Sequence, residues 1–474
     1  MQFKRILLIQ PMHEKQKKKN KKKKVRTSIS FPWGLATLAA SYQQAGYDVE
    51  ILDGHALQLS KEALLPEIIK LDFDIVGITA FSTQYPTVKL LAEHIKKTFR
   101  VPVIVGGPLA SYQAEMVLGT THVDVCVIGE GEIAGVEVLR SWSDPGNVKS
   151  IAFKEKGNCV LTMPQDRFVD IEELALPDFS LFDMERYVWH NNKYAGTKNT
   201  GIRAMTFITS RGCPYRCHFC SKSCLSFRRM SPKKVYEMIA GLKREFKLEE
   251  IYFGDELFLS SKSSFKELAP MLKSLNIPWA GQARVNLMDK EFLDMIKETN
   301  CVGIGYGVES GSQRILDNMN KKVTVKQIEF AMNYTQKLKM PIKVQLIFGY
   351  SGENEETVQE TIDLFKRVDH PGRRFNVITP IPGSKLYDDC MIKGLIQDEP
   401  GYLAAIEKGF GIGKVHVNLT DWPDDEIYPR KKAAEKAISN NYYNKSLSRK
   451  TRYFLGKLRK KLSRRAKKII IPRN

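Results

Sequence analysis

Residues Ser210–Cys224 read S-R-G-C-P-Y-R-C-H-F-C-S-K-S-C and place Cys213, Cys217 and Cys220 in a Cys-x3-Cys-x2-Cys spacing. Three cysteines this close cannot all pair as disulfides, and their spacing suits a loop that wraps one compact centre. A structural zinc site would normally have a fourth ligand and paired Cys-x2-Cys units. The ferredoxin pattern, Cys-x2-Cys-x2-Cys-x3-Cys followed by proline, is absent. Three thiolates would leave one iron of a 4Fe–4S cluster open to a small molecule; the alternative is buried or metal-structural cysteines.

The cysteine triad, with Phe219 immediately before Cys220, resembles the signature of the radical SAM superfamily. In that family the open iron is chelated by the amino and carboxylate groups of S-adenosylmethionine (SAM). The resemblance implies that Cys213, Cys217 and Cys220 hold a 4Fe–4S cluster and that Phe219 packs against the adenine. Cys224 follows Cys220 after three further residues. We interpret it either as a buried thiol or as a catalytic residue facing the substrate.

The composition indicates an ordinary globular protein. The chain has 474 residues, enough for two or three domains, with 43% hydrophobic and 27% charged residues. Eight cysteines without a secretory signal argue for a reducing compartment, where cysteines serve metals rather than disulfides. The apolar run at the start is too short for a signal peptide or a membrane span. We therefore expect a cytoplasmic protein.

The net charge of +21 is concentrated in two segments. Residues Lys15–Arg26 contain nine Lys or Arg, and residues Lys445–Asn474 contain thirteen, with no acidic residue in either. The rest of the chain is therefore close to neutral, so the overall charge does not by itself indicate a nucleic-acid-binding protein. We expect the first segment to be a solvated loop, with contact to an anionic surface as the alternative.

The first part of the chain alternates short apolar runs with amphipathic stretches. This alternation predicts a doubly wound parallel sheet, whose ligands bind at the carboxyl ends of the strands. The strands are expected at Phe3–Gln10, Val49–Leu52, Asp74–Ala80, Val101–Gly107 and Val123–Gly129, and helices at Gly34–Gly46, Lys61–Leu71 and Val88–Phe99.

Together with the cysteine loop, this part resembles the cobalamin-binding domain of cobalamin-dependent radical SAM enzymes. The resemblance rests on V-G-G-P after the fourth strand, I-G-E-G-E after the fifth and F-P-W-G-L-A-T-L-A-A at the first helix. The Asp-x-His-x-x-Gly motif of the family's other branch is absent, and His55 follows the second strand, so we expect cobalamin without a histidine ligand. An unliganded flavodoxin-like domain is the alternative. The residues predicted to contact cobalamin are Thr79, Ser82, Thr83, Gly106, Gly107, Pro108, Gly129 and Glu130.

A hairpin at Val148–Thr162 and a polar connector at Pro164–Asn199 precede a second alternating block. Its strand and helix pattern predicts six βα units, the partial barrel typical of radical SAM cores. We expect a cobalamin-binding-like domain at 1–145, a hairpin and connector at 146–199, a partial barrel at 200–385 and a helical region with a basic tail at 386–474. The expected strands are Met205–Thr209, Glu250–Gly254, Trp279–Arg284, Gly303–Val308, Ile342–Phe348 and Asn376–Thr379, and the helices are Pro232–Phe246 and about 264–275, 289–299, 324–339 and 354–368.

Polar residues at these strand ends match, by position, the family's contacts to SAM. Asp255 stands where the family has the second glycine of Gly-Gly-Glu, so the match there is partial. Arg284 is suited to a carboxylate, and Glu309 and Ser310 to ribose hydroxyls. Each residue has a purely structural alternative. The predicted SAM-binding residues are Gly254, Asp255, Glu256, Arg284, Glu309, Ser310 and Gln345, and Tyr306 is predicted, with Cys224, to be catalytic.

The resemblance implies an enzyme in which an electron from the cluster cleaves SAM to methionine and a 5′-deoxyadenosyl radical. With cobalamin bound, the expected reaction is methylation of an unactivated carbon. The alternatives are a cobalamin-associated radical cyclisation or rearrangement and a non-catalytic iron–sulfur electron-transfer or cobalamin sensor protein. A flavodoxin or ferredoxin would donate the electron, and the substrate is a small or lipid-like molecule.

The basic tail has an apolar stripe formed by Leu455, Leu458, Leu462 and Ala466. This pairing of apolar and cationic faces is compatible with peripheral contact to an anionic membrane, here the inner face. A phosphate-driven contact with RNA, which we consider the weaker case, and a solvated tail are the alternatives.

Overall fold

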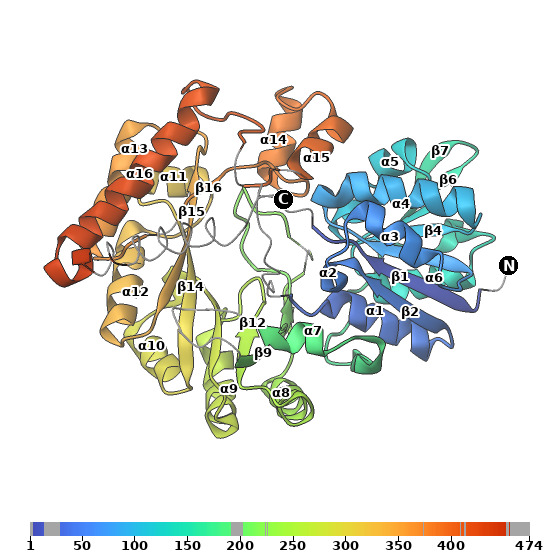
Figure 1. Ribbon diagram of the computed structural model, residues 1–474, viewed down its shortest axis with the longest axis horizontal. Coiled ribbons are helices and arrows are strands. Elements are labelled where there is room, and N and C mark those ends of the chain that lie inside the picture. Colours follow the sequence, from blue (N-terminus) through green and yellow to red (C-terminus); the bar gives the residue numbers. More distant parts are fainter. Residues whose placement is uncertain are drawn as a thin grey trace, which may run out of the picture.

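Figure 1 shows the computed structural model of the chain, in which two α/β units lie side by side with helices α14 and α15 between them. The Lys-rich segment Lys15–Arg26 and most of the basic tail lie outside the described residues. The structure describes residues 3–13, 29–190, 202–222, 224, 226–372, 374–407, 409–411, 414–451 and 455.

The first unit is built on a seven-stranded sheet with the order β2-β1-β3-β4-β5-β6-β7. Strands β1 to β5 are parallel, so the predicted doubly wound sheet is confirmed. The predicted hairpin does not stand apart in a connector: it adds two antiparallel strands to the β5 edge. The strands are β1 (Arg5–Gln10), β2 (Asp48–Asp53), β3 (Ile75–Thr79), β4 (Val103–Gly106), β5 (Val125–Val127), β6 (Ile151–Glu155) and β7 (Asn158–Leu161).

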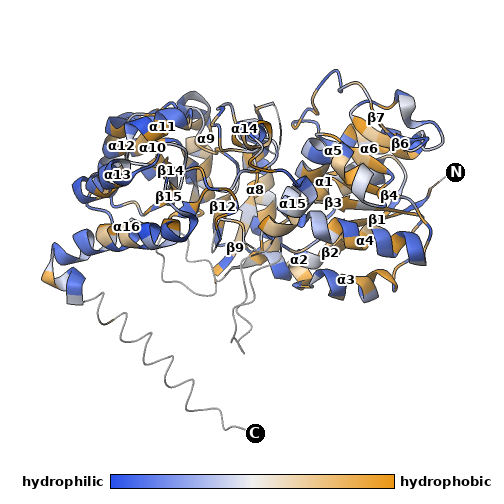
Figure 2. Cartoon of the chain, turned by 90° about the horizontal axis from the view of Figure 1, so that it is seen from above, coloured by the Kyte–Doolittle hydropathy of each residue, from blue (hydrophilic) through white to orange (hydrophobic). Residues whose placement is uncertain are grey.

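Helices cover both faces of this sheet, and Figure 2 shows hydrophobic residues on the strands and hydrophilic residues on the outer helix surfaces. Helices α5 and α6 begin directly after β4 and β5, so Pro108 and the second Gly-Glu pair of I-G-E-G-E lie in first turns rather than in loops. The apolar residues of α5 are not concentrated on one face, which removes the usual sequence signal for a helix. The helices are α1 (Trp33–Gln44), α2 (Gly54–Leu57), α3 (Lys61–Ile68), α4 (Tyr85–Thr98), α5 (Pro108–Thr120) and α6 (Gly131–Arg140), with a 3-10 turn at Ser82–Gln84.

The second unit is an open barrel with the strand order β16-β15-β14-β13-β12-β9-β8. All neighbours from β9 to β16 are parallel, which confirms the predicted partial barrel, and β8 adds an antiparallel edge. The strands are β8 (Trp189–His190), β9 (Ile202–Phe207), β12 (Glu250–Phe253), β13 (Trp279–Ala283), β14 (Cys301–Glu309), β15 (Ile342–Phe348) and β16 (Asn376–Val377). The helices are α7 (Glu185–Val188), α8 (Pro232–Phe246), α9 (Lys262–Leu275), α10 (Lys290–Lys297), α11 (Gln313–Asn318), α12 (Val325–Lys337) and α13 (Glu355–Arg367).

The C-terminal region is helical, as predicted, with α14 (Lys385–Ile392), α15 (Glu399–Glu407) and α16 (Asp424–Asn444). Helix α15 packs its buried Leu403 and Ile406 into the core of the first unit. Its last residue, Glu407, forms a buried ion pair with Lys61, at 3.2 Å. Among the described residues, no helix is both long and apolar enough to span a bilayer. Leu455 is exposed, and the other residues of the predicted tail stripe lie outside the described part of the chain.

One hydrophobic core continues from the first unit into the second. Trp33, at the start of α1, is 6% exposed, and its indole N–H donates to the carbonyl oxygen of Thr206 at 2.8 Å. The indole ring meets the ring of Phe207 edge-on, with 5.0 Å between centroids. The first strand of the barrel is therefore anchored directly to the first helix of the neighbouring unit.

We predict that Trp33→Ala lowers the free energy of unfolding by about 3–5 kcal/mol, because it leaves a cavity in this shared core and an unpaired carbonyl at Thr206. Urea denaturation followed by circular dichroism measures the change. Trp142→Ala is the control, since Trp142 is only partly buried against Phe3 at the far side of the first sheet. Equal losses in the two variants would contradict a shared core.

Candidate active site

The cysteine loop is closed at its base by a two-stranded stem. Strand β10 (Ser210–Arg211) pairs antiparallel with β11 (Arg228–Arg229), so that Arg211 lies opposite Arg228. Gly212 leaves the stem at φ +73°, and a Cβ on it would lie 2.5 Å from the carbonyl oxygen of Ser226. Only glycine fits this turn, because a side chain would meet backbone in a conformation that L-residues rarely adopt.

Backbone contacts from distant segments hold the loop. The N–H of His218 donates to the carbonyl oxygen of Met319 at 2.9 Å, and the His218 carbonyl oxygen accepts from the N–H of Leu386, also at 2.9 Å. The amide of Asn320 donates to the Arg216 carbonyl oxygen at 2.8 Å. The turn after α11 and the start of α14 therefore fix the middle of the loop. Met319 and Leu386 could not be predicted from the sequence because they act through main-chain groups, and Asn320 because its partner is 104 residues away.

The first unit also contributes hydrogen bonds that hold the cysteine loop. The hydroxyl of Tyr112, on α5, donates to the carbonyl oxygen of Lys222 at 2.7 Å, and the ammonium of Lys222 donates to the carbonyl oxygen of Cys213 at 2.8 Å. The Ser221 hydroxyl donates to the carbonyl oxygen of Pro382 at 2.7 Å. The cysteine loop thus lies between the carboxyl ends of the strands of both sheets.

Cys213 and Cys217 are partly exposed and Cys220 is exposed, and the three thiols lie close enough to influence one another. Loss of solvation around the thiol, together with the neighbouring Glu256, Cys217 and Cys213, raises the pKa of Cys220 to about 12. The pKa of the Cys213 thiol is raised for the same main reason. A bound cationic centre would favour the ionised form of these thiols, as the predicted cluster requires.

The described residues contain no three His, Cys, Asp or Glu side chains arranged to hold a single metal ion. The Cys-x3-Cys-x2-Cys spacing of the loop remains compatible with the predicted cluster.

Arg284 is a buried charge beside the triad. It is 5% exposed, its Nη1 lies 3.5 Å from the sulfur of Cys217, and its guanidinium stacks 3.7 Å over the ring of Tyr215. Its Nε and Nη2 find no acceptor among the described residues. A buried guanidinium with two unused donor groups is costly unless an anion completes it, so this position is suited to a carboxylate ligand.

The two carboxylates after β12 have different surroundings. Asp255 is buried and accepts from the Thr209 N–H at 2.8 Å and from the Ser210 hydroxyl, so it anchors the strand that enters the stem. Burial raises the pKa of Asp255, an effect that these hydrogen bonds partly offset. Glu256 faces the site instead, since its charge raises the pKa of Cys213, Cys220 and Tyr112. Gly254 packs against Thr206, whose methyl carbon would lie 2.5 Å from an added Cβ.

The inner face near β14 holds an ion pair that the sequence analysis identified only in part. Glu309, at φ +62°, accepts from the buried ammonium of Lys321 at 3.0 Å. That ammonium also lies 5.6 Å from the ring centre of Phe219. Gln345 is exposed and donates to Gln282 at 3.4 Å, whereas Ser310 is buried. Lys321 lies in M-N-K-K, twelve residues after Glu309, and no local motif marked it.

Tyr306, predicted to be catalytic, lies in the hydrophobic core. It is 0% exposed, and its hydroxyl is 2.8 Å from the Thr335 hydroxyl on α12, outside the barrel. Alternation along β14 directs this side chain away from the cysteine loop, so its position does not support a catalytic role. Cys224 lies at the boundary of the units, with its sulfur 3.8 Å from the Glu130 carboxylate, and burial raises its pKa to about 11.

The strand ends of the first sheet form an open edge. Added Cβ atoms on Gly106 and Gly129 would meet nothing within 4 Å, whereas one on Gly107, at φ +81°, would lie 3.0 Å from the Ala80 carbonyl oxygen and 3.1 Å from the Thr79 hydroxyl. Ser82 is buried and bonded to Gln113, so its hydroxyl is already used. Thr83 lies in the 3-10 turn that follows β3.

Three aromatic rings that the sequence analysis did not combine lie at this edge. The ring of His13, after β1, is 5.1 Å from the ring of Phe81, after β3, and 6.1 Å from that of His55, after β2. The sheet places β2 beside β1, which brings His55 close to the end of the first strand. Phe81 is 52% exposed at the point where the strand order reverses, the usual place for a ligand in such sheets.

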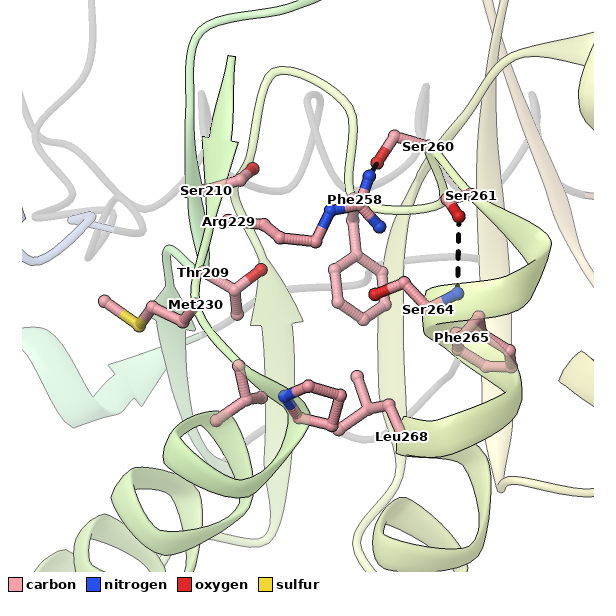
Figure 3. Close-up of a pocket in the computed structure, with 12 residues that line it drawn as sticks. Thr209, Ser210, Arg229, Met230, Phe258, Ser260, Ser261, Ser264, Phe265 and Leu268 are labelled. Atoms are coloured by element: carbon pink, nitrogen blue, oxygen red, sulfur yellow. Dashed lines mark hydrogen bonds between the residues drawn. The ribbon is translucent and has the colours of Figure 1, made fainter. Parts of the chain in front are cut away.

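A small cavity behind the stem is distinct from this site. It has a volume of about 30 Å³ and lies between the stem and the first turns of α8 and α9. Figure 3 shows Arg229 and Ser260 bonded across it and Phe258 beneath them. Such a volume admits water but no cofactor.

Comparison with known families agrees with this geometry. Residues 24–139 match the B12 binding domain family, and residues 207–365 match the radical SAM superfamily. The two matches correspond to the first sheet unit and to the partial barrel.

An uncharacterized methyltransferase from Pyrococcus horikoshii is 31% identical over 409 residues, which cover 84% of this chain and 85% of the relative. Cytidylyl-2-hydroxyethylphosphonate methyltransferase from Streptomyces wedmorensis is 24% identical, and the match covers 78% of this chain and 79% of that relative. The structure of the radical SAM methyltransferase TsrM from Kitasatospora setae shares the fold, with a TM-score of 0.63 at 16% identity over 83% of this chain and 75% of TsrM. The chain therefore belongs to the radical SAM enzymes that carry a B12 binding domain.

Proposed function

We propose that this enzyme binds a 4Fe–4S cluster, SAM and cobalamin and transfers a methyl group to an unactivated carbon of a small molecule. The proposal rests on the position of the cysteine loop between the strand ends of the two sheets. Beside the loop lies Arg284, whose Nε and Nη2 have no acceptor among the described residues. When bound, the cofactors supply an electron, a radical that removes a substrate hydrogen, and a carrier for the methyl group.

Within this proposal the chain's own residues bind and orient. Cys213, Cys217 and Cys220 hold the cluster, and the donors of Arg284 bind the carboxylate of SAM. Glu256, which faces the cysteines, accepts from the amino group. The hydrogen bonds around the loop fix the positions of the cysteines relative to Arg284.

The adenosine moiety would lie along the inner face of the barrel. Phe219 offers its ring to the adenine, and Glu309 and Gln345 offer acceptors to the ribose. The buried ammonium of Lys321 fixes Glu309, so it acts on SAM through that carboxylate.

Cobalamin would bind at the open edge of the first sheet. Gly106 and Gly129 leave room for a flat macrocycle to approach the backbone, and Phe81 presents an apolar ring to it. Methylation is favoured over cyclisation because both relatives described above are named methyltransferases. Reduction requires an external donor, for which we propose a flavodoxin or ferredoxin.

The first prediction concerns the cluster. Simultaneous change of Cys213, Cys217 and Cys220 to Ala removes the iron and sulfide that the parent acquires on anaerobic reconstitution, because no other thiols lie on this loop in the same arrangement. Cys224→Ala, the matched control on the same loop, retains the parent's iron content. Iron bound by the triple variant in the parent's amount would rule out the assignment.

The second prediction concerns SAM. Arg284→Met raises the KM for SAM about 10- to 100-fold, because a hydrogen bond to a charged group contributes about 1.5–3 kcal/mol. Cleavage of SAM to 5′-deoxyadenosine by the reduced enzyme is the assay. Arg203→Met is the control, since Arg203 lies near the start of β9, two strands away from β13 and at the opposite end of the sheet, and binds Glu185. An unchanged KM in Arg284→Met would remove this residue from the site.

The third prediction separates methylation from cyclisation. Protein purified without oxygen and loaded with cobalamin converts SAM to S-adenosylhomocysteine as well as to 5′-deoxyadenosine, because a transferred methyl group leaves S-adenosylhomocysteine behind. Liquid chromatography with mass spectrometry measures both. Formation of 5′-deoxyadenosine alone, with cobalamin bound, would favour a cyclase or rearrangement enzyme. A protein that acquires no cobalt would contradict the proposed cofactor.

A further inference from the structure

The stem of the cysteine loop carries two like charges side by side. Arg211 and Arg228 are directly paired across β10 and β11, an arrangement that is unfavourable in a two-stranded ribbon unless anions neutralise it. Both side chains are largely buried, with 17% and 18% of their surface exposed. The stem therefore depends on carboxylates supplied from elsewhere.

Those carboxylates come from the other unit. Glu130 accepts from Arg211 at 2.8 Å and from Arg228 at 2.7 Å, and Glu132 also accepts from Arg211. Thr37, on α1, donates to Glu132 at 3.0 Å and fixes it in turn. Burial raises the pKa of Glu130, but the two arginines more than offset this and keep it below its ordinary value. The ion pairs between these carboxylates and the two arginines are therefore formed by fully charged groups.

Glu130 and Glu132 belong to the segment Gly129–Glu132, at the end of β5 and the start of α6. This segment carries the open glycine edge of the first sheet, with Gly129 at φ +77°. On the other side, Arg211 is followed by Gly212 and then Cys213. The two buried ion pairs of Arg211, with Glu130 and Glu132, therefore join the edge offered to cobalamin to the first cysteine of the loop.

We propose that Arg211 is a positioning residue that transmits occupancy of the cobalamin edge to the cysteine loop. This rests on the proposed function above, since it requires both cofactors. A ligand that moves Gly129–Glu132 moves the carboxylates that hold the stem, and Gly212 passes that shift to Cys213. Glu130 was predicted to contact cobalamin; in this account it acts through the arginines instead.

The test is the electron paramagnetic resonance spectrum of the reduced cluster, recorded with and without cobalamin. Titanium(III) citrate reduces cobalamin to its diamagnetic cobalt(I) state. The excess titanium(III), which is itself paramagnetic, is removed by anaerobic gel filtration, so that the remaining signal comes from the cluster. We expect cobalamin to shift the g values in the parent and in Glu407→Gln, which breaks another buried ion pair, between α3 of the first unit and α15, away from the cysteine loop. Arg211→Met, with iron and cobalt bound in parental amounts, loses this response, and Arg211→Lys restores part of it.

A full response in Arg211→Met, or none in a parent that holds both cofactors, overturns the proposal. Should Arg211→Met fail to bind iron, Glu132→Gln decides, because it removes one partner of Arg211 and leaves the stem sequence intact. A lost or reduced response in Glu132→Gln supports the coupling, and a full response overturns it. A parent that binds no cobalamin contradicts the proposed function rather than the coupling.

Discussion

Three thiols on one short loop cannot by themselves fix a charged centre, because the loop between β10 and β11 has little regular structure of its own. The rest of the chain provides what the loop lacks. Main-chain groups of Met319 and Leu386 hold its middle, Tyr112 holds its far side, and Asp255 holds the strand that leads into it. Ordering a loop costs conformational entropy residue by residue, so these contacts from four distant segments are a condition for the site.

The need to hold the cysteine loop by contacts from outside it explains why two sheets are needed. Each presents the carboxyl ends of parallel strands, where the loops that follow the strands carry the side chains of the site. The barrel brings Arg284, Glu256 and Glu309 to the cysteines, and the first sheet brings glycines with open space in front of them. The core around Trp33 and the pair Lys61–Glu407 hold the two edges in one arrangement. A radical generated on one edge would therefore form close to the other.

Residue patterns predicted the architecture well where local chemistry decides structure. Helix α8 (Pro232–Phe246) was predicted to the residue because Ser231 caps it, proline begins it and its apolar face is regular. Arg284 and Glu256 were predicted to bind SAM because they stand at strand ends that match the family's contacts, and the structure places Arg284 beside Cys217. Contacts that join distant segments left no such mark, so Lys321, Tyr112 and Asn320 were not identified. Tyr306 lies on the outer face, against Thr335, because side chains alternate along an extended strand, and the sequence prediction of a catalytic role did not anticipate this position.

The central claim is that three protein thiols leave one iron of the cluster open to SAM. Mössbauer spectroscopy of protein reconstituted with isotopically enriched iron tests it directly, because each iron reports its own ligands. The account predicts that addition of SAM changes the isomer shift of one iron site out of the four and leaves the others as they were. A spectrum that is unchanged by SAM, with the cluster intact, would mean that a fourth protein ligand completes the cluster and would contradict the account.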